Sequence, residues 1–143
     1  MSKKEKAVGI KLCLANPKEG KTENIILNPS QLAYFIGKKI GDEIDASFLG
    51  RSGYFIKITG GTDRDGFPMR PDVSGGRKVA ILLSSGIGYH PKRKPSSKKK
   101  KKRAKRPIKG KRKRVIVRGN VITDAIAQIN AILIEKSKEV KKE

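Results

Sequence analysis

The chain has 143 residues, 36% of them hydrophobic, and its 35 Lys and Arg against 13 Asp and Glu give a formal net charge of +22. This length suits one domain with a modest core. No apolar run approaches the ~20 residues that span a bilayer, so no membrane partner is expected. Cys13 is the single cysteine and residues 1–6 do not resemble a signal peptide, which favours the cytoplasm over a disulfide-forming compartment.

The first part of the chain predicts a β-hairpin. Apolar side chains in residues 7–15 alternate with Gly9, Lys11 and Cys13, as in a half-buried strand. Residues 16–21 have turn composition and residues 23–28 are again strand-like, so the two strands are expected to pair. The apolar face of the first strand would carry Val8, Ile10, Leu12 and Leu14.

A short helix is predicted for residues 31–36. Pro29 and Ser30 suit a helix start, and Gly37 and Gly41 limit its length. The side chains expected to face inward are Leu32, Phe35 and Ile36.

Further strands are predicted around glycine-rich turns. Residues 44–49 and 54–59 are strand-like, and residues 60–66 would form a tight loop. Residues 79–83 are a continuous apolar run, typical of a buried strand, and residues 115–117 are strand-like again. In the strand predicted at residues 54–59, one face would carry Phe55 and, more weakly, Lys57 and Thr59.

Residues 123–135 fit two structures. A helix would place Ile122, Ile126, Ile129 and Leu133 in one apolar stripe. Residues 128–135 also fit a β-branched strand, and a helical turn followed by a strand is favoured.

Strands every ~8–12 residues predict a mainly β fold, in the form of a small closed or barrel-like antiparallel sheet with one or two short helices. We expect a single domain, with its β core at residues 7–90 and 115–136 and a charged tail at residues 137–143.

The positive charge is concentrated in one segment. Sixteen of the 23 residues at 92–114 are Lys or Arg and none is acidic, and residues 73–123 hold 19 basic residues and no acidic one. Unpaired charges of this density cannot be buried in a core, and three prolines disfavour a continuous helix. We therefore expect a long basic arm at about residues 91–114, between two parts of one core.

Such an arm suits a phosphate backbone, because ammonium and guanidinium groups neutralise phosphates and release counterions. A solvated spacer, a nuclear-localisation-like patch and acidic lipid are alternatives, although the segment has no apolar face to insert into a membrane. Twenty-three extended residues span ~75 Å, so a doubled-back loop reaches on the order of 35 Å. That reach would allow it to enter a crevice of a folded RNA.

No catalytic constellation is found. Residues 63–66 lack the remaining ligands of a calcium loop, and residues 84–88 are glycine-rich but are not followed by the Lys-Ser/Thr of a P-loop. His90 is the only histidine and has no evident catalytic partner. A metal at the turn cluster of Asp42, Glu43 and Asp45 is only a weak alternative. No enzyme activity, cofactor, metal or small-molecule substrate is therefore predicted.

Residues 58–70 read Ile-Thr-Gly-Gly-Thr-Asp-Arg-Asp-Gly-Phe-Pro-Met-Arg. With shorter matches at residues 16–21, 36–43, 71–73, 82–84, 88–93 and 117–120, this ordered set closely resembles the eukaryotic and archaeal S6e family of small-subunit ribosomal proteins. The resemblance covers roughly residues 7–136. The lysine run at residues 98–102 departs from the family pattern, and the long C-terminal extension of eukaryotic members is absent, which favours an archaeal-type member.

The resemblance implies a structural protein of the small ribosomal subunit that binds the subunit's large rRNA, meets neighbouring small-subunit proteins and does not homo-oligomerise. Recognition would rely on RNA shape and backbone, because Lys has little base-reading geometry. A free nucleic-acid-binding or DNA-compacting protein is the alternative, followed by an RNA-modifying enzyme. The residues expected to contact rRNA are Arg64, Arg70, His90, Lys92, Arg93, Lys94, Lys98, Lys99, Lys100, Lys101, Lys102, Arg103, Lys105, Arg106, Lys109, Lys111, Arg112, Lys113, Arg114 and Arg118.

The signature also has a structural interpretation. Glycines at positions 60 and 61 would let the backbone leave a strand with a positive φ, and Asp63 would cap N–H groups in the turn. The apolar residues that follow would form a rigid wedge that closes the core or faces RNA. The predicted structural set is Gly60, Gly61, Asp63, Gly66, Phe67, Pro68 and Met69.

Overall fold

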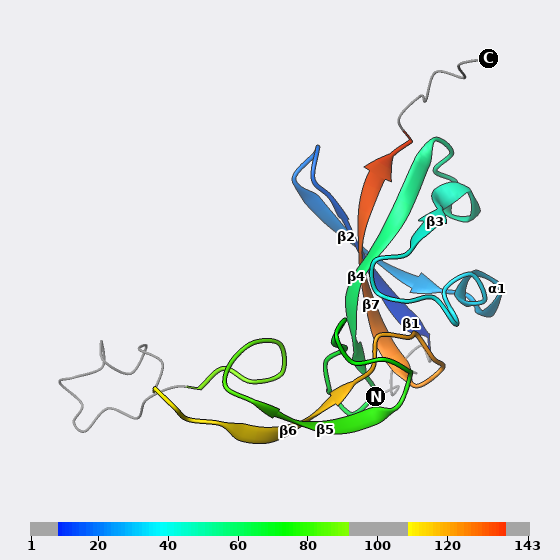
Figure 1. Cartoon of the computed structure of the whole chain (residues 1–143). Coiled ribbons are helices and arrows are strands. Elements are labelled where there is room, and N and C mark those ends of the chain that lie inside the picture. Colours follow the sequence, from blue (N-terminus) through cyan, green and yellow to red (C-terminus); the bar gives the residue numbers. More distant parts are fainter. Residues whose placement is uncertain (1–8, 92–108, 137–143) are drawn as a thin grey trace, which may run out of the picture.

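The computed structural model describes residues 9–91 and 109–136, which form two sheets (Figure 1). A five-stranded sheet has the order β2-β1-β7-β4-β3, and a separate two-stranded ribbon consists of β5 and β6. The elements are β1 (Ile10–Asn16), β2 (Lys21–Leu27), α1 (Pro29–Leu32), β3 (Glu43–Asp45), the 3-10 helix η1 (Ala46–Leu49), β4 (Tyr54–Asp63), β5 (Lys78–Leu83), β6 (Lys113–Arg118) and β7 (Ile126–Glu135).

The predicted N-terminal hairpin is confirmed. β1 and β2 pair antiparallel, with Ile10 opposite Leu27 and Asn16 opposite Lys21. The period-two pattern has its expected cause, because Leu12 and Leu14 are buried on the inner face of β1 while Lys11 is exposed.

β7 lies at the centre of the larger sheet, although it is the last strand of the chain. It pairs parallel with β1, with Leu12 opposite Ile129, and antiparallel with β4, with Ile58 opposite Ala131. The sheet is therefore mixed and open, and the expectation of a closed or barrel-like antiparallel sheet is wrong. A parallel pair needs a long crossover connection, and this sheet uses most of the chain between β1 and β7 for it.

The predicted helix is shorter than expected. α1 ends at Leu32, and Phe35 is fully buried in the turns that follow it. Ile36 is 48% exposed, so its predicted inward position is wrong. The Phe35 ring packs edge-on against the ring of Phe48, with centroids 5.6 Å apart, and this contact fixes the turn.

Two predicted strand boundaries are also wrong. The strand expected at residues 44–49 is β3 followed by η1, because the Asp45 carboxylate accepts a hydrogen bond of 2.9 Å from the backbone N–H of Ser47 and caps the 3-10 turn. β4 extends beyond residue 59 to Asp63, with a bulge between Ile58 and Gly60, so the glycines expected in a loop are strand residues.

The core lies on one face of the five-stranded sheet. It includes Ile56 and Ile58, which lie on the opposite face of β4 from the predicted Phe55, Lys57 and Thr59. The ambiguous C-terminal segment turns at Asp124 and Ala125 and then runs as β7, in agreement with the favoured turn and strand. The buried side chains here are Ile122, Ile126, Ile129, Ala131 and Leu133.

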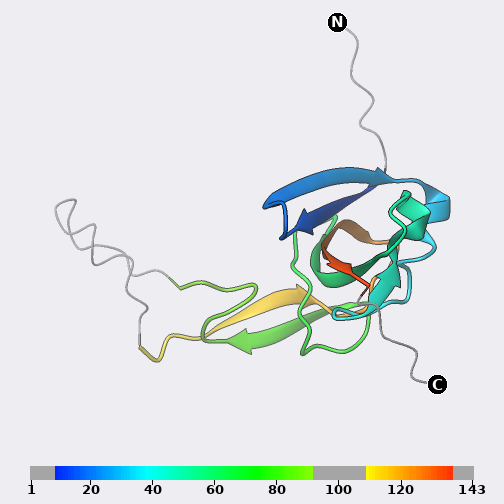
Figure 2. The ribbon, with the colours of Figure 1, turned by 90° about the horizontal axis from the view of Figure 1, so that it is seen from above.

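β5 is not the buried strand that its apolar run predicted. Its residues alternate between exposed and half-buried, and Leu82 is 56% exposed. The reason is its place in the fold, since β5 pairs only with β6, and the ribbon runs away from the larger sheet in two perpendicular views (Figures 1 and 2).

Candidate nucleic-acid interface

At Gly61 the backbone of β4 lies very close to its neighbours. A Cβ atom at this residue would lie 2.6 Å from the carbonyl oxygen of Gln128 and 2.9 Å from the sulfur of Met69. Neither Gly61 nor Gly60 has a positive φ, so the expected conformational reason is wrong. Gly61 is required by crowding, whereas a Cβ on Gly60 would meet nothing within 4 Å. Gly66, with φ of 87°, does serve the turn.

The chain reverses directly after β4. The Asp63 N–H donates to the Phe67 carbonyl at 2.9 Å, and the Met69 N–H donates to the Gly61 carbonyl at 3.0 Å. Met69 is thereby buried in the core, and the half-buried Phe67 ring lies 5.1 Å from the Lys78 ammonium. The apolar wedge of the signature therefore closes the core through Met69.

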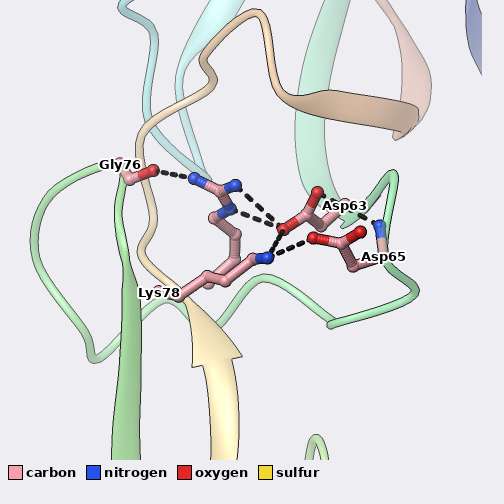
Figure 3. A network of polar contacts seen from close by, with 5 residues as sticks. Asp63, Asp65, Gly76 and Lys78 are labelled. Atoms are coloured by element: carbon pink, nitrogen blue, oxygen red, sulfur yellow. Dashed lines mark hydrogen bonds and ion pairs between the residues drawn. The ribbon is translucent and has the colours of Figure 1, made fainter.

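Asp63 is the centre of a polar network between the two sheets (Figure 3). Its fully buried carboxylate accepts hydrogen bonds from Nε of Arg118 at 2.9 Å and from the backbone N–H of Asp65 at 3.3 Å. Arg118 also donates from Nη1 to the Gly76 carbonyl at 2.6 Å. Lys78 approaches the same Asp63 oxygen at 3.8 Å and pairs with Asp65. The predicted capping role of Asp63 is thus accompanied by an ion pair that the sequence did not reveal.

The pKa of Asp63 reflects a balance of opposing effects. Burial acts to raise the pKa of the carboxyl group, but the hydrogen bond from Arg118 and the one from the Asp65 N–H lower it. The positive charges of Arg118 and Lys78 act in the same direction, so the pKa lies below the ordinary aspartate value. The carboxylate is therefore ionised at neutral pH and holds Arg118 in place.

Arg70 forms a second ion pair near the base of the ribbon. Its Nε and Nη2 atoms donate to the two carboxylate oxygens of Asp72 at 2.8 and 2.7 Å, and Nη1 donates to the Ile87 carbonyl at 2.8 Å. The side chain is 14% exposed. The hydrogen bonds with Asp72 raise the pKa of Arg70 and lower that of Asp72. Arg70, which the sequence predicted as an rRNA contact, is therefore largely enclosed and bound to a carboxylate of the same chain.

The other predicted contact residues divide into three groups. Arg118 is held by Asp63, as described, whereas Arg64 and His90 are exposed. The far end of the ribbon carries the exposed cations Lys109, Lys111, Arg112, Lys113 and Arg114. Outside the described residues lie Lys92, Arg93, Lys94, Lys98, Lys99, Lys100, Lys101, Lys102, Arg103, Lys105 and Arg106.

The sequence alone did not reveal the ion pairs at the base of the ribbon. Asp65, Asp72 and Lys78 each take part in the ion pairs around the ribbon base. A signal was present, because Asp63, Asp65 and Asp72 are the last acidic residues before the acid-free residues 73–123. Acidic groups at the border of a strongly cationic segment are expected to pair with its nearest arginines.

The weak alternative of a metal site has no support in the described part of the chain, where no group of three His, Cys, Asp or Glu residues could hold an ion. Asp42 instead accepts the Lys39 N–H at 2.8 Å, and Asp45 accepts from Lys136 at 2.5 Å. Among the described helices, none is long and apolar enough to cross a membrane.

The geometry defines a class of protein in which a compact β-sheet carries a projecting ribbon with exposed cations at its far end, an arrangement suited to a polyanion. Residues 10–142 match the family described as "Ribosomal protein S6e", and the chain belongs to this family. The resemblance inferred from residues 58–70 is thereby confirmed.

Similar proteins come from several archaea. The chain is 42% identical over 119 residues to the small ribosomal subunit protein eS6 of Methanothermobacter thermautotrophicus, which covers 83% of this chain and 82% of that protein. It is 42% identical over 125 residues to the eS6 protein of Methanocaldococcus jannaschii, which covers 87% and 82%. It is 39% identical over 129 residues to the eS6 protein of Archaeoglobus fulgidus, in an alignment that covers 90% of this chain and 88% of that protein.

Proposed function

We propose that this chain is a structural component of the small ribosomal subunit and binds the large rRNA of that subunit. In this role it neutralises phosphates where RNA helices crowd, supports assembly and translation, and acts in the cytoplasm. The observation that carries the proposal is membership of the S6e family over nearly the whole chain, with archaeal relatives named as small ribosomal subunit proteins.

The distribution of charge supports rRNA as the partner. The acidic residues at the ribbon base neutralise Arg70, Arg118 and Lys78, whereas the sequence from residue 73 to residue 123 contains no acidic group. Within residues 9–91 and 109–136 no carboxylate forms an ion pair with the cations at residues 109–114, and RNA phosphates would supply their counter-charges.

The finer parts of the proposal rest on sequence. The chain acts as one domain, residues 92–108 belong to a basic arm that contacts phosphates, and neighbouring small-subunit proteins are further partners. We expect neither homo-oligomers nor catalysis, and membership of a ribosomal protein family supports the absence of an enzyme activity.

Fractionation of cells that produce the tagged chain tests this proposal. The chain should sediment with the small subunit in a sucrose gradient and remain there after a moderate salt wash. Cofractionation with the nucleoid, together with release from ribosomes at low salt, would instead support a DNA-compacting protein. A variant with Lys98–Lys102 replaced by Ser should show weaker retention if the arm contacts rRNA.

A further inference from the structure

The two faces of the β5–β6 ribbon have different surroundings. In the antiparallel register Ala80 lies opposite Ile116 and Leu82 lies opposite Arg114, so these four side chains share one face. The other face is half-buried over most of its length, and Val117 on it is fully buried. The exposed side, formed by Ala80, Leu82, Arg114 and Ile116, is called the ribbon face below.

The ribbon face carries an apolar patch in open solvent. Leu82 is 56% exposed and Ile116 is 45% exposed. The two residues are diagonal neighbours across the strand pair, a spacing at which long side chains come into reach of each other. Single exposed apolar residues are common on protein surfaces, but adjacent ones on a projecting ribbon indicate a contact surface.

Charge around this patch changes along the ribbon. At the base, Lys78 and Arg118 are neutralised by Asp63 and Asp65. At the other end, Arg114 and residues 111–113 are exposed, and the sequence contains no acidic residue between positions 73 and 123. The ribbon face is therefore apolar in its middle and cationic at its far end.

We propose that the ribbon face docks into the minor groove of double-helical RNA, with Leu82 and Ile116 against riboses and with Arg114 and the preceding Lys111 and Arg112 against the flanking phosphates. This inference rests on the proposed function and assigns the surface and the RNA feature. Docking of the ribbon face differs from the binding proposed for the basic arm, because it relies on apolar contact as well as on charge.

The shape of A-form RNA favours this groove. Its major groove is deep and narrow, whereas its minor groove is wide and shallow and displays the riboses. A two-stranded ribbon whose strands lie ~4.8 Å apart can lie flat on such a surface. An apolar protein partner would leave Arg114, Lys111 and Arg112 without counter-charges, whereas the phosphates that border the groove supply them.

The test is a double variant, Leu82→Ser with Ile116→Ser, measured against archaeal small-subunit rRNA transcribed in vitro. A matched control is Ile26→Ser with Ile36→Ser, because these residues are 57% and 48% exposed and lie outside the ribbon. Circular dichroism should show both variants folded, since all four side chains are exposed in the wild type.

We expect the ribbon variant to bind this rRNA about tenfold more weakly, as two partly buried apolar contacts are lost. The slope of log K against log[salt] should remain that of the wild type, because no phosphate contact is removed. Hydroxyl-radical footprinting should show ribose protection on both strands across a minor groove for the wild type, and loss of that protection in the ribbon variant. The control variant should bind and protect as the wild type does.

Equal affinity of the ribbon variant and the wild type, beside steep salt dependence in both, would overturn this inference and leave the proposed function standing. Normal binding of the ribbon variant to free rRNA, combined with its loss from assembled subunits, would assign the face to a protein and overturn the RNA assignment. A wild-type chain without salt-dependent rRNA binding would overturn both.

Discussion

Asp63 at the end of β4 and Arg118 at the end of β6 are 55 residues apart in sequence, and Nε and Nη2 of Arg118 each lie 2.9 Å from the same Asp63 oxygen. This contact joins the larger sheet to the base of the ribbon (Figure 3). Asp63, a residue of the family signature, therefore binds Arg118, which follows the cationic segment in sequence. Loss of this contact should destabilise the fold.

Replacement of Asp63 by Asn should destabilise the fold. Arg118 would lose its counter-charge in a site with little access to solvent, at a cost of roughly 2–3 kcal/mol. Urea unfolding at neutral pH measures the loss. The matched control is Asp65→Asn, because the exposed pair of Asp65 with Lys78 should contribute less than about 1 kcal/mol. Equal destabilisation by the two variants would contradict a special role for Asp63.

The Asp63 ion pair should also make stability fall in acid. The folded-state pKa of Asp63 lies below its ordinary value of 3.8, so its contribution is present above that value and is lost as pH falls through the folded-state pKa. Asp72 behaves in the same way, and the hydrogen bond from Lys136 lowers the pKa of Asp45 to about 2. Urea unfolding from pH 7 into the range below pH 4 should show a decline that is shallower in Asp63→Asn. The same pH dependence in variant and wild type would count against this assignment.

Gly61→Ala and Gly60→Ala should differ sharply. A methyl group at Gly61 would collide with the Gln128 carbonyl at 2.6 Å, which requires the β4–β7 pair to shift at a cost of roughly 1–3 kcal/mol. Gly60 has open space at the same position, so Gly60→Ala should be nearly neutral. Thermal melting compares the two variants. A larger loss for Gly60→Ala would show that the bulge, rather than the close approach at Gly61, limits substitution.

Arg70→Gln should loosen the turn that leads into the cationic segment. Arg70 donates to the Ile87 carbonyl, and the enclosing turn is closed by the reciprocal hydrogen bonds of Gly86 and Tyr89 at 2.9 and 3.1 Å. Loss of the Arg70 hydrogen bonds should speed amide exchange of those two residues by about fivefold or more. Arg64→Gln is the control, since the Arg64 side chain is exposed and its backbone N–H donates to the Ala125 carbonyl at 3.2 Å rather than to this turn. Unchanged exchange in Arg70→Gln would show that the turn holds itself.

Removal of cations from the far end of the ribbon should flatten the salt dependence of rRNA binding. If the cations of residues 111–114 each meet a phosphate, replacement of all four by Ser should reduce the slope of log K against log[salt] by about 3 units. A control variant removes the same charge from exposed lysines elsewhere, namely Lys11, Lys21, Lys38 and Lys39. An equal change in the two variants would show that net charge, and not contact at the ribbon, sets the slope.

The sequence alone determined the features that depend on neighbouring residues. Alternation in residues 7–15 and turn composition in residues 16–21 predicted the first hairpin, because side-chain period and turn chemistry act over a few residues. The ordered motif around residues 58–70 identified the family, and the acid-free cationic segment predicted a polyanion as the partner class.

Only the tertiary structure decided which groups remain free and which are neutralised. The sheet is mixed because β7 lies between β1 and β4, it is open because β2 and β3 remain at its edges, and β5 is exposed because it pairs with β6 alone. Both are long-range pairings that local patterns do not encode. In the same way, the sequence predicted that Arg70 and Arg118 are free to contact rRNA. In the folded chain, Arg70 is bound by Asp72 and Arg118 is bound by Asp63. Charge density is a property of the sequence, whereas the availability of each charge depends on the residues that the fold places beside it.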